Sequence, residues 1–368
     1  MSRKLRVAIL FEGKSAEHEV SLQSARNVVQ AMDKRKYDTV LIGIDKHGSW
    51  HLSDASQYLL NAENPKMISL NAGGENVALV TNASGERELV NLQSQQPLAP
   101  VDVVFPILHG PFGEDGTIQG LLKLMGVPFV GASVLGSAVG MDKDVMKRLL
   151  RDAGLPVSQF MVIHKHQSKA TDYGQVTAKL GLPMFVKPAN MGSSVGIHKV
   201  TSAQDLRVAV SDALRYDKKV ILEENVAGRE IECSVIGNDD PLASLPGEII
   251  PHHEFYSYEA KYIDEDGAGL QVQAQLSDSM TKAVQELSVR TFQVLCCEGM
   301  ARVDTFLTAD DRLFVNEINT IPGFTKISMF PKLWEESGLS PTALIDRLIE
   351  LALERFEKER ALRTSIDL

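Results

Sequence analysis

The 368-residue sequence predicts an α/β fold divided into more than one domain, and three observations support this prediction. Short apolar runs typical of buried strands alternate with segments whose apolar residues recur at helical spacing. The chain is also longer than one hydrophobic core usually supports. Toward the C-terminus, two alternating segments around a polar turn predict an antiparallel hairpin, so this part is expected to be α+β.

The first unit combines buried strands with amphipathic helices. Leu5–Leu10 predicts a strand, and a helix that starts between residues 15 and 20 is predicted next, from the spacing of Leu22, Ala25, Val29 and Met32. Further strands are predicted at Thr39–Ile44 and Val101–Leu108, before a helix that ends at Gly126. This alternation implies parallel βαβ units with ligands at the strand ends. Ser53–Pro100 is polar and weakly periodic, and we interpret it as an insertion of unknown purpose.

A second unit is predicted from Gly131, where Asp142 is expected to cap a helix that ends at Gly154. Short strands at Met184–Val186 and Val220–Leu222 flank a glycine-rich segment and a helix opened by Thr201 or Ser202. A third unit starts near Glu223 and ends in a long helix that carries Leu344, Leu348 and Leu351. The predicted domains are therefore 1–130, 131–222 and 223–368.

Composition excludes several classes of protein. The formal net charge of −10 argues against a nucleic-acid binder that relies on phosphate neutralisation. The three cysteines, Cys233, Cys296 and Cys297, form no metal-ligand pattern, and we expect buried free thiols. The N-terminal apolar run is broken at Glu12, so it resembles neither a signal peptide nor a membrane span, and a cytoplasmic enzyme is expected.

The predicted hairpin carries the first candidate site. Period two places Arg302 and Asp304 on one face of the first strand, and Glu317 and Asn319 on one face of the second. If the two faces coincide, oxygen ligands suited to Mg²⁺ converge there. The alternative is a polar face exposed to solvent, and the hairpin pattern alone does not distinguish the two.

A glycine-rich loop is the second candidate, within Phe185–Gly196. Lys187 ends an apolar strand, and Ser193 and Ser194 follow among glycines that let backbone N–H groups approach a phosphate. The loop is no Walker A sequence, and the alternative is a flexible loop without a ligand.

Three further segments offer polar groups to a ligand. The acidic residues of Val220–Val235 suit a base and a ribose, although a solvated acidic loop fits them as well. The loops Gly13–Leu22 and His109–Thr117 both follow strands, so they are expected to meet at one edge of the sheet. Lone histidines such as His109 are more often structural. The loop Pro322–Pro331 and the aromatic segment that contains Lys261 complete the set.

Taken in order, the motifs resemble the ATP-grasp family of D-alanine–D-alanine ligases, and in particular its longer members. The resemblance rests on GKSAEHEVSL, HGPFGEDGT, MDK, FVKPANMGSSVG, EAKY and NEINTIPGFT, and the segments that contain these motifs span residues 13–331. It implies an ATP-grasp fold preceded by a Rossmann-like N-terminal (pre-ATP-grasp) domain. It also implies ligation of two D-alanine molecules through a D-alanyl phosphate for peptidoglycan synthesis, by a homodimer that uses ATP and two Mg²⁺ or Mn²⁺ ions.

The resemblance also implies roles for single residues. The nucleotide and its phosphates would be bound by Lys143, Lys187, Ser194, Glu223, Glu224, Val226, Glu230 and Lys261. The metal ions would be bound by Asp304, Glu317 and Asn319. The amino acids and the oxyanion would be bound by Glu19, His109, Lys261, Arg302, Gly323, Ser328 and Met329. Glu19, Ser193 and Tyr262 would close a loop over the site.

Two alternatives remain open at this point. A relative that uses D-serine or D-lactate as second substrate would share most of these motifs. EAKY resembles the D-alanine type. The sequence does not give the volume of the pocket near Met329, so D-serine stays open as a second substrate. A non-catalytic ATP sensor would be expected to have lost a metal ligand or Arg302, and the sequence retains all of them.

Overall fold

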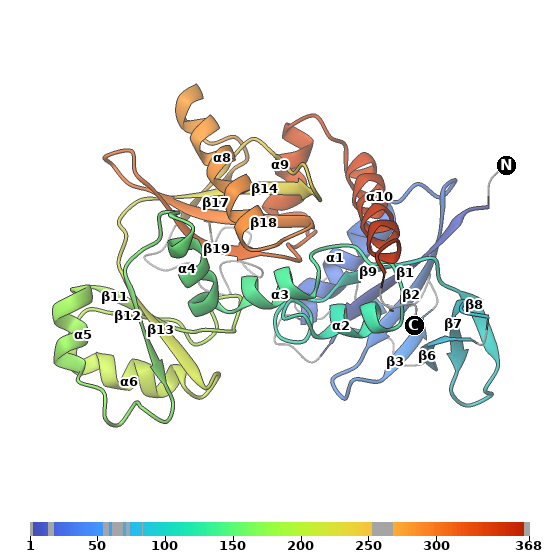
Figure 1. Ribbon diagram of the computed structural model, residues 1–368, viewed down its shortest axis with the longest axis horizontal. Helices are drawn as coiled ribbons and strands as arrows, with labels where there is room; N and C mark the ends of the chain where they lie inside the picture. Colours follow the sequence, from blue (N-terminus) through green and yellow to red (C-terminus); the bar gives the residue numbers. More distant parts are fainter. Residues whose placement is uncertain are drawn as a thin grey trace.

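The computed structural model describes residues 3–13, 18–53, 59–60, 69–70, 74–82, 84–251 and 268–363. Its two ends are formed by different sheets, a seven-stranded sheet near the N-terminus and a four-stranded sheet with α5 and α6 (Tyr173–Leu180 and Ala203–Ala213). A third sheet lies between and above them in Figure 1. The α/β prediction is confirmed.

The N-terminal sheet has the strand order β8-β7-β6-β3-β2-β1-β9. Its strands are β1 Leu5–Glu12, β2 Tyr37–Ile44, β3 Trp50–Ser53, β6 Glu75–Thr81, β7 Arg87–Asn91, β8 Pro97–Pro100 and β9 Val103–Ile107. β1 pairs in parallel with β2 and β9, as the strand–helix alternation predicts, whereas the strands from β3 to β8 pair antiparallel. The helices of this part are α1 His18–Ala31 and α2 Thr117–Leu124.

The polar stretch Ser53–Pro100, which the sequence analysis interprets as an insertion, contains more regular structure than its weak periodicity indicates. Three of its segments form β6, β7 and β8, which extend the N-terminal sheet, and β4 (Leu59–Leu60) pairs with β5 (Ser69–Leu70). Along β6 only the two alternate residues Val77 and Leu79 are buried. A pattern of period two over so short a strand is weak, which explains why the sequence did not reveal it.

The central part begins with two helices, α3 Val134–Met141 and α4 Lys143–Asp152. Asp142 caps α4 as predicted, since its side chain accepts the backbone N–H groups of Asp144 and Val145. The sheet order is β10-β13-β11-β12, and every pairing is antiparallel. The strands are β10 Phe160–His164, β11 Met184–Pro188, β12 His198–Val200 and β13 Lys219–Glu224.

The C-terminal sheet has the order β17-β16-β14-β18-β19, with β15 also paired to β14. Its strands are β14 Arg229–Gly237, β15 Leu242–Ala243, β16 Gly247–Pro251, β17 Ala268–Gln271, β18 Gly299–Leu307 and β19 Leu313–Asn319. The helices are α8 Asp278–Val294, α9 Met329–Glu336 and α10 Pro341–Arg360. The antiparallel hairpin predicted around Ala309–Arg312 is confirmed as β18 and β19.

The hydrophobic core ties the C-terminal part to the N-terminal sheet. Leu344, Leu348 and Leu351 of α10 are buried in one cluster with Val7 and Ile9 of β1. Arg355, also on α10, donates to the carbonyl oxygens of Phe129 and Gly131 at 2.7 and 2.6 Å. These contacts hold the chain in place where the second predicted domain begins. The division of the chain at residues 130 and 222 stays a proposal. Strand β13 includes residue 222 and continues beyond it.

The cysteine prediction needs one correction. All three cysteines are free and Cys233 and Cys297 are buried, but Cys296 is exposed. It lies in the turn after α8 with a φ of 54°, so its side chain leaves the core that its neighbour enters. In the part of the chain that the structure describes, no helix has the length and apolar character needed to span a membrane.

Candidate active site

Two cavities meet between the three sheets. The larger has a volume of about 280 Å³ and is lined by β11, β13, the loop after β11 and the start of β14. The smaller, of about 70 Å³, lies over β18 and β19 and beside residues 321–329. Gly192, Ser193 and Glu317 line both. A ligand in one cavity therefore lies next to a ligand in the other.

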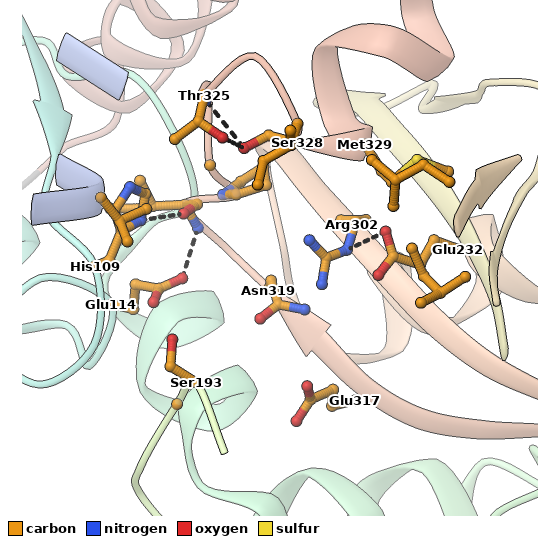
Figure 2. A pocket seen from close by; sticks show the side chains of 18 residues that line it. His109, Glu114, Ser193, Glu232, Arg302, Glu317, Asn319, Thr325, Ser328 and Met329 are labelled. Carbon is orange, nitrogen blue, oxygen red and sulfur yellow. Dashed lines mark hydrogen bonds and ion pairs between the residues drawn. The ribbon is translucent and has the colours of Figure 1, made fainter. Parts of the chain in front are cut away.

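The register of β18 and β19 brings the predicted polar residues together. Arg302 lies opposite Asn319, and Asp304 lies opposite Glu317. Their faces coincide, because Asn319 Nδ2 donates to Asp304 Oδ2 at 3.0 Å. The convergence predicted from period two is thus confirmed, and Figure 2 shows Arg302, Asn319 and Glu317 along one face.

Arg302 is held in place by two carboxylates. Its Nε and Nη2 each donate to Asp304 at 2.7 Å, a paired geometry that restricts rotation of the guanidinium. Glu232 on the neighbouring strand β14 lies 3.1 Å from the Arg302 Nε (Figure 2). All three side chains are largely buried. The positive charge of Arg302 is therefore fixed at the wall of the smaller cavity.

A β-bulge changes the direction of two neighbouring side chains in β19. Asp304 pairs with Glu317 but Thr305 pairs with Val315, so Asn316 is the extra residue. Asn316 Oδ1 accepts from Lys187 Nζ at 3.4 Å, and Glu317 lies 3.4 Å from Lys143 Nζ. Both residues line the larger cavity as a result. The sequence analysis did not identify Asn316, because regular alternation places it on the opposite face from Glu317.

A buried ion-pair cluster lies at the base of the larger cavity. Glu223 forms ion pairs with two lysines: its Oε1 lies 2.7 Å from Lys147 Nζ, and its Oε2 lies 2.6 Å from Lys187 Nζ. Burial would raise the pKa of Glu223, but the charges of the two lysines outweigh it and lower this pKa to about 2. Burial would likewise lower the pKa of Lys187, but Glu223 and Glu317 more than compensate and raise it. Lys187 therefore stays charged beside the cavity.

Lys147 is a residue that the sequence analysis missed. It is 1% exposed, and its Nζ also donates to Ser158 Oγ at 3.0 Å. Burial lowers its pKa, with Lys187 adding repulsion and Glu223 opposing both. The available signal was its position one helical turn after Lys143, on the buried face of α4.

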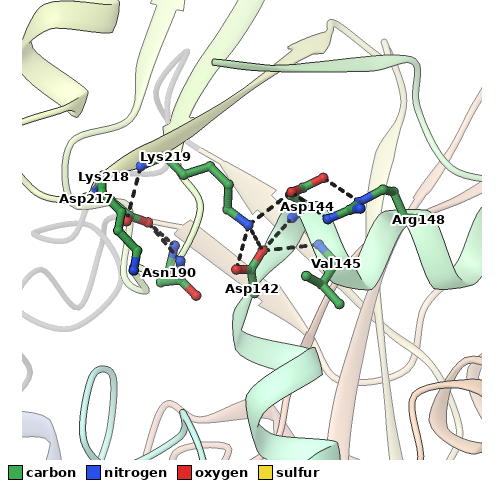
Figure 3. A network of polar contacts seen from close by, with 8 residues as sticks. All are labelled: Asp142, Asp144, Val145, Arg148, Asn190, Asp217, Lys218 and Lys219. Carbon is green, nitrogen blue, oxygen red and sulfur yellow. Dashed lines mark hydrogen bonds and ion pairs between the residues drawn. The ribbon is translucent and has the colours of Figure 1, made fainter. Parts of the chain in front are cut away.

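The start of α4 is anchored to the central sheet by a second charged network (Figure 3). Lys219 Nζ, at the start of β13, lies 2.7 Å from both carboxylate oxygens of Asp142 and 3.0 Å from Asp144. Burial opposes the charge on Asp142, yet the hydrogen bond from Lys219 lowers the Asp142 pKa overall. The Lys143 N–H donates to the Ala189 carbonyl at 3.0 Å. Together these contacts fix Lys143 against the loop that follows β11.

The loop after β11 has the backbone of an anion-binding turn. Ser193, Ser194 and Gly196 have φ values of 50°, 60° and 68°, the left-handed backbone conformation that occurs in anion-binding turns. Lys143 Nζ donates to the Met191 carbonyl at 2.9 Å, which brings a cation to the same loop. Ser193 lines both cavities.

The far wall of the smaller cavity is the segment Ile321–Met329. A Cβ on Gly323 would lie 2.7 Å from Ser328 Oγ, so a larger residue there would displace the Ser328 hydroxyl. Ser328 Oγ accepts the Thr325 N–H at 2.9 Å and pairs with Thr325 Oγ1 at 2.8 Å (Figure 2). The side chain of Met329 closes the apolar end of the cavity with Ile249 and Leu270.

His109 is buried beside this segment. Its Nδ1 lies 3.0 Å from the Ile321 carbonyl oxygen, and its Nε2 lies 3.4 Å from Ser24 Oγ. Burial lowers the pKa of His109 to about 4, so the ring is neutral at physiological pH. Neighbouring Glu114 accepts the N–H groups of Gly110 and Ile321 at 2.8 and 3.1 Å. His109 is thus a structural hydrogen-bonding residue that also lines the cavity.

The candidate metal ligands fit a magnesium ion that shares its coordination with another ligand. Asp304, Glu317 and Asn319 offer only oxygen among their side-chain acceptors. Glu317 lies at the junction of the two cavities, Asn319 lines the smaller one, and Asp304 lines a small cavity beside them. No group of three or more His, Cys, Asp or Glu side chains within the described residues could hold a metal ion by itself. Mg²⁺ is usually bound by one or two carboxylates and completed by water and phosphate. The donor set therefore fits an ion that enters with a phosphate group.

The structure places most of the predicted residues at these two cavities. The larger is lined by Lys143, Lys187, Ser193, Ser194, Glu223, Glu224, Val226, Glu230 and Glu317. The smaller is lined by His109, Ser193, Arg302, Glu317, Asn319, Gly323, Ser328 and Met329. Asp304 instead lines a cavity of about 40 Å³ beside them, with Glu230, Glu232 and Glu317. Lys261, Tyr262 and the side chain of Glu19 lie outside the described residues.

Comparisons with known proteins identify the family of the chain. Residues 6–132 match the family model described as D-ala D-ala ligase N-terminus, and residues 149–350 match D-ala D-ala ligase C-terminus. The D-alanine–D-alanine ligase of Oceanobacillus iheyensis is 53% identical over 362 residues, which cover 98% of this chain and 99% of the relative.

Two solved structures are similar over nearly the whole chain. The D-alanine–D-alanine ligase from Coxiella burnetii has a TM-score of 0.84 at 38% identity, with 98% of this chain and 97% of the other covered. The VanG D-Ala:D-Ser ligase from Enterococcus faecalis has a TM-score of 0.83 at 35% identity, with 95% and 100% covered. Ligases named for two different products therefore share this fold.

Proposed function

The chain belongs to the D-alanine–D-alanine ligase family, and on this premise we propose that it joins two D-alanine molecules at the expense of ATP. The product, D-alanyl-D-alanine, is a precursor of peptidoglycan. One observation carries the proposal beyond family membership: the two cavities share Ser193 and Glu317. A nucleotide in the larger cavity would present its terminal phosphate to a carboxylate in the smaller one.

The larger cavity suits ATP in size and charge. A volume of about 280 Å³ is within reach of a nucleoside base and sugar, and Lys143, Lys187 and the left-handed turn at Ser194 supply positive groups for phosphates. We assign Glu223, Glu224 and Val226 to adenine and Glu230 to the ribose hydroxyls. Lys261, outside the described residues, is assigned to the phosphates.

We assign Asp304, Glu317 and Asn319 to two Mg²⁺ or Mn²⁺ ions that accompany the nucleotide. Such ions, when bound, neutralise the phosphate charge that otherwise repels an attacking carboxylate. Lys143 and Lys187 would also neutralise phosphate charge, since each lies 3.4 Å from an acceptor on β19, beside the proposed metal ligands. Asp304 would exchange part of its contact with Arg302 for this role.

The first step forms the activated intermediate. A carboxylate oxygen of the first D-alanine bonds to the γ-phosphorus, the bond to the bridging oxygen breaks, and ADP leaves with that electron pair. We assign Glu19 to the ammonium group of this D-alanine, with His109 beside it. Arg302 is fixed at the cavity wall by Asp304 and Glu232, where it would hold the acyl oxygen.

The second step forms the amide. The amine of the second D-alanine attacks the acyl carbon, the carbon–oxygen bond to phosphate breaks, and phosphate and a proton leave. Arg302 and the Gly323 N–H are assigned to the oxyanion, because donors aimed at developing charge are the largest catalytic contribution in acyl transfer. Ser328 is assigned to the carboxylate of the second substrate, with Lys261 as a second contact, and Met329 limits the size of its side chain.

An acyl phosphate hydrolyses in water, so the reaction needs a closed site. We propose that Ser193 links with Tyr262 and Glu19 to close a loop over the junction of the cavities. Ser193 is suited to this because it lines both cavities and lies in the left-handed turn.

A coupled assay tests the proposal. ADP release that depends on D-alanine, with dipeptide formed in equal amount, supports the ligase. Nucleotide binding without turnover would identify a sensor instead and overturn the proposal. Offering D-alanine, D-serine and D-lactate in competition then identifies the second substrate, which is needed because a D-Ala:D-Ser ligase shares the fold.

Two further properties are proposed from the resemblance. We place the enzyme in the cytoplasm, where ATP is available, and expect a homodimer. Analytical ultracentrifugation of the full chain tests the latter, and a species with the mass of a single 40.4 kDa chain would contradict it.

A further inference from the structure

Helix α1 contacts the segment that carries Gly323 through two side chains to which no role is assigned above. Ser24 Oγ accepts the Phe324 N–H at 3.1 Å, and Asn27 Nδ2 donates to the Phe324 carbonyl oxygen at 2.8 Å. The two residues are three apart on one helix, so they face the same way. Both backbone groups of the residue that follows Gly323 are therefore held by α1.

His109 extends this contact to the other side of Gly323. The Ile321 carbonyl can only accept, so the neutral ring carries its proton on Nδ1 and leaves Nε2 as an acceptor. The Ser24 hydroxyl then donates to Nε2 and keeps its lone pairs for the Phe324 N–H. One chain of hydrogen bonds, all between buried groups, thus runs from Ile321 through His109 and Ser24 to Phe324.

We propose that Ser24 and Asn27 are positioning residues that hold the Phe324 peptide and thereby fix Gly323 at the wall of the smaller cavity. The Phe324 ring is buried in the core and packs edge-on against Phe105 and Phe330, with ring centroids 6.0 and 5.5 Å apart. Apolar packing of this kind is non-directional, so it places the ring but does not set the orientation of the Phe324 peptide. The two hydrogen bonds, from Asn27 and to Ser24, fix the orientation of the backbone at Phe324. An oxyanion donor must lie within a few tenths of an ångström of its target to be effective.

The inference deepens the proposed function and rests on it, because Gly323 is assigned to the oxyanion of the second step. Glu19, the proposed anchor of the first D-alanine, lies in the first turn of the same helix. A single rigid element would therefore set the first substrate and the oxyanion donor relative to each other. Loss of Ser24 or Asn27 should slow attack on the acyl phosphate more than its formation.

The test measures ADP and dipeptide together in the full-length protein with ATP, Mg²⁺ and D-alanine. The variants are Ser24→Ala, Asn27→Leu and Asn27→Asp; the last keeps the size of the side chain but presents oxygen to the Phe324 carbonyl. We expect dipeptide formation to fall by about tenfold to a hundredfold. ADP formation should fall less, so the ADP-to-dipeptide ratio rises above one as the intermediate hydrolyses. Gln30→Leu, at an exposed position of the same helix, is the matched control and should keep the ratio at one.

The outcomes distinguish failure of the proposed ligase function from failure of the positioning role of Ser24 and Asn27. If the wild-type protein forms no dipeptide, the proposed function is wrong and the inference is overturned with it. If the wild type couples one ADP to one dipeptide and the variants lose both in equal proportion, Ser24 and Asn27 only stabilise the fold, and the inference alone is overturned. Because Asn27 is half-buried, Asn27→Asp is expected to fold and provides this answer even if Ser24→Ala does not.

Discussion

Lys147 Nζ lies 2.7 Å from Glu223 Oε1 at the base of the larger cavity, where the two side chains are 1% and 4% exposed. Little of this pair is accessible to solvent, so the two charges are compensated mainly by protein groups. Glu223 forms a second ion pair, with Lys187, whereas the further contact of Lys147 is with a neutral group, the hydroxyl of Ser158. Removal of either side chain therefore leaves the other charge buried with less compensation.

Replacing Lys147 by methionine should destabilise the protein by about 3 kcal/mol, because removal of one partner leaves a buried carboxylate with less compensation. Urea unfolding at pH 7 measures the free energy of unfolding of each variant. Lys179→Met, at an exposed position on α5, is the matched control and should change stability little. The double variant with Glu223→Gln should recover part of the loss. Equal stability of Lys147→Met and wild type would show that the pair contributes nothing.

His109 makes stability depend on pH. Its folded pKa of about 4 lies below the ordinary value of 6.5, so the folded state disfavours the charged ring. The contribution of His109 is complete above pH 6.5 and is lost as the pH falls through 6.5 toward 4, because only the unfolded chain then binds the proton. The full loss corresponds to about 3 kcal/mol.

Urea unfolding at pH 7 and pH 4.5 checks this prediction on wild type and His109→Gln. The wild type should lose more stability between the two pH values than the variant, which has no ring to protonate. His47→Gln, at an exposed position, should behave like the wild type. A His109→Gln variant with the same pH dependence as wild type would contradict the buried neutral ring.

The sequence predicted the hairpin of the site well because its chemistry follows strand periodicity. Alternation alone placed Arg302 with Asp304 and Glu317 with Asn319, and the register then joined the two faces. The same rule failed at Asn316, because a bulge breaks the alternation at one residue and depends on the pairing of two strands. The periodicity of one strand does not show how that strand pairs with its neighbour, so it cannot predict the bulge.

Lys147 and Ser24 were missed for a related reason. Each is a polar residue on the buried face of a helix, and its partner lies far along the chain, Glu223 for one and Phe324 for the other. Local patterns reveal that a face is buried, but not which backbone group it meets. Cys296 is an apolar residue that was predicted to be buried and is exposed. It lies beside the buried Cys297, and the turn after α8 changes the direction of the chain at this point.

Glu317 is the only one of the proposed metal ligands that lines all three cavities of the site. Glu317→Ala should lower turnover by on the order of 10²-fold or more, because it removes an anionic ligand at the point of phosphoryl transfer. Chelation of divalent ions should abolish turnover in the wild type. Folding should change little, as Glu317 is partly exposed and its contact with Lys143 is 3.4 Å long. Full activity with an unchanged Mg²⁺ requirement would remove Glu317 from the metal site.

Arg302 separates the two halves of the reaction, since it lines the smaller cavity and not the larger one. Arg302→Ala should slow dipeptide formation by on the order of 10² to 10³, the usual effect of losing an oxyanion donor, while ATP affinity changes little. Arg302→Lys should recover little activity, because a lysine cannot reproduce the paired contact with Asp304. Rapid-quench measurement of ligation and a separate ATP titration distinguish the two effects. If ATP affinity falls while the rate of ligation at saturating ATP is preserved, Arg302 acts on the nucleotide and not on the oxyanion.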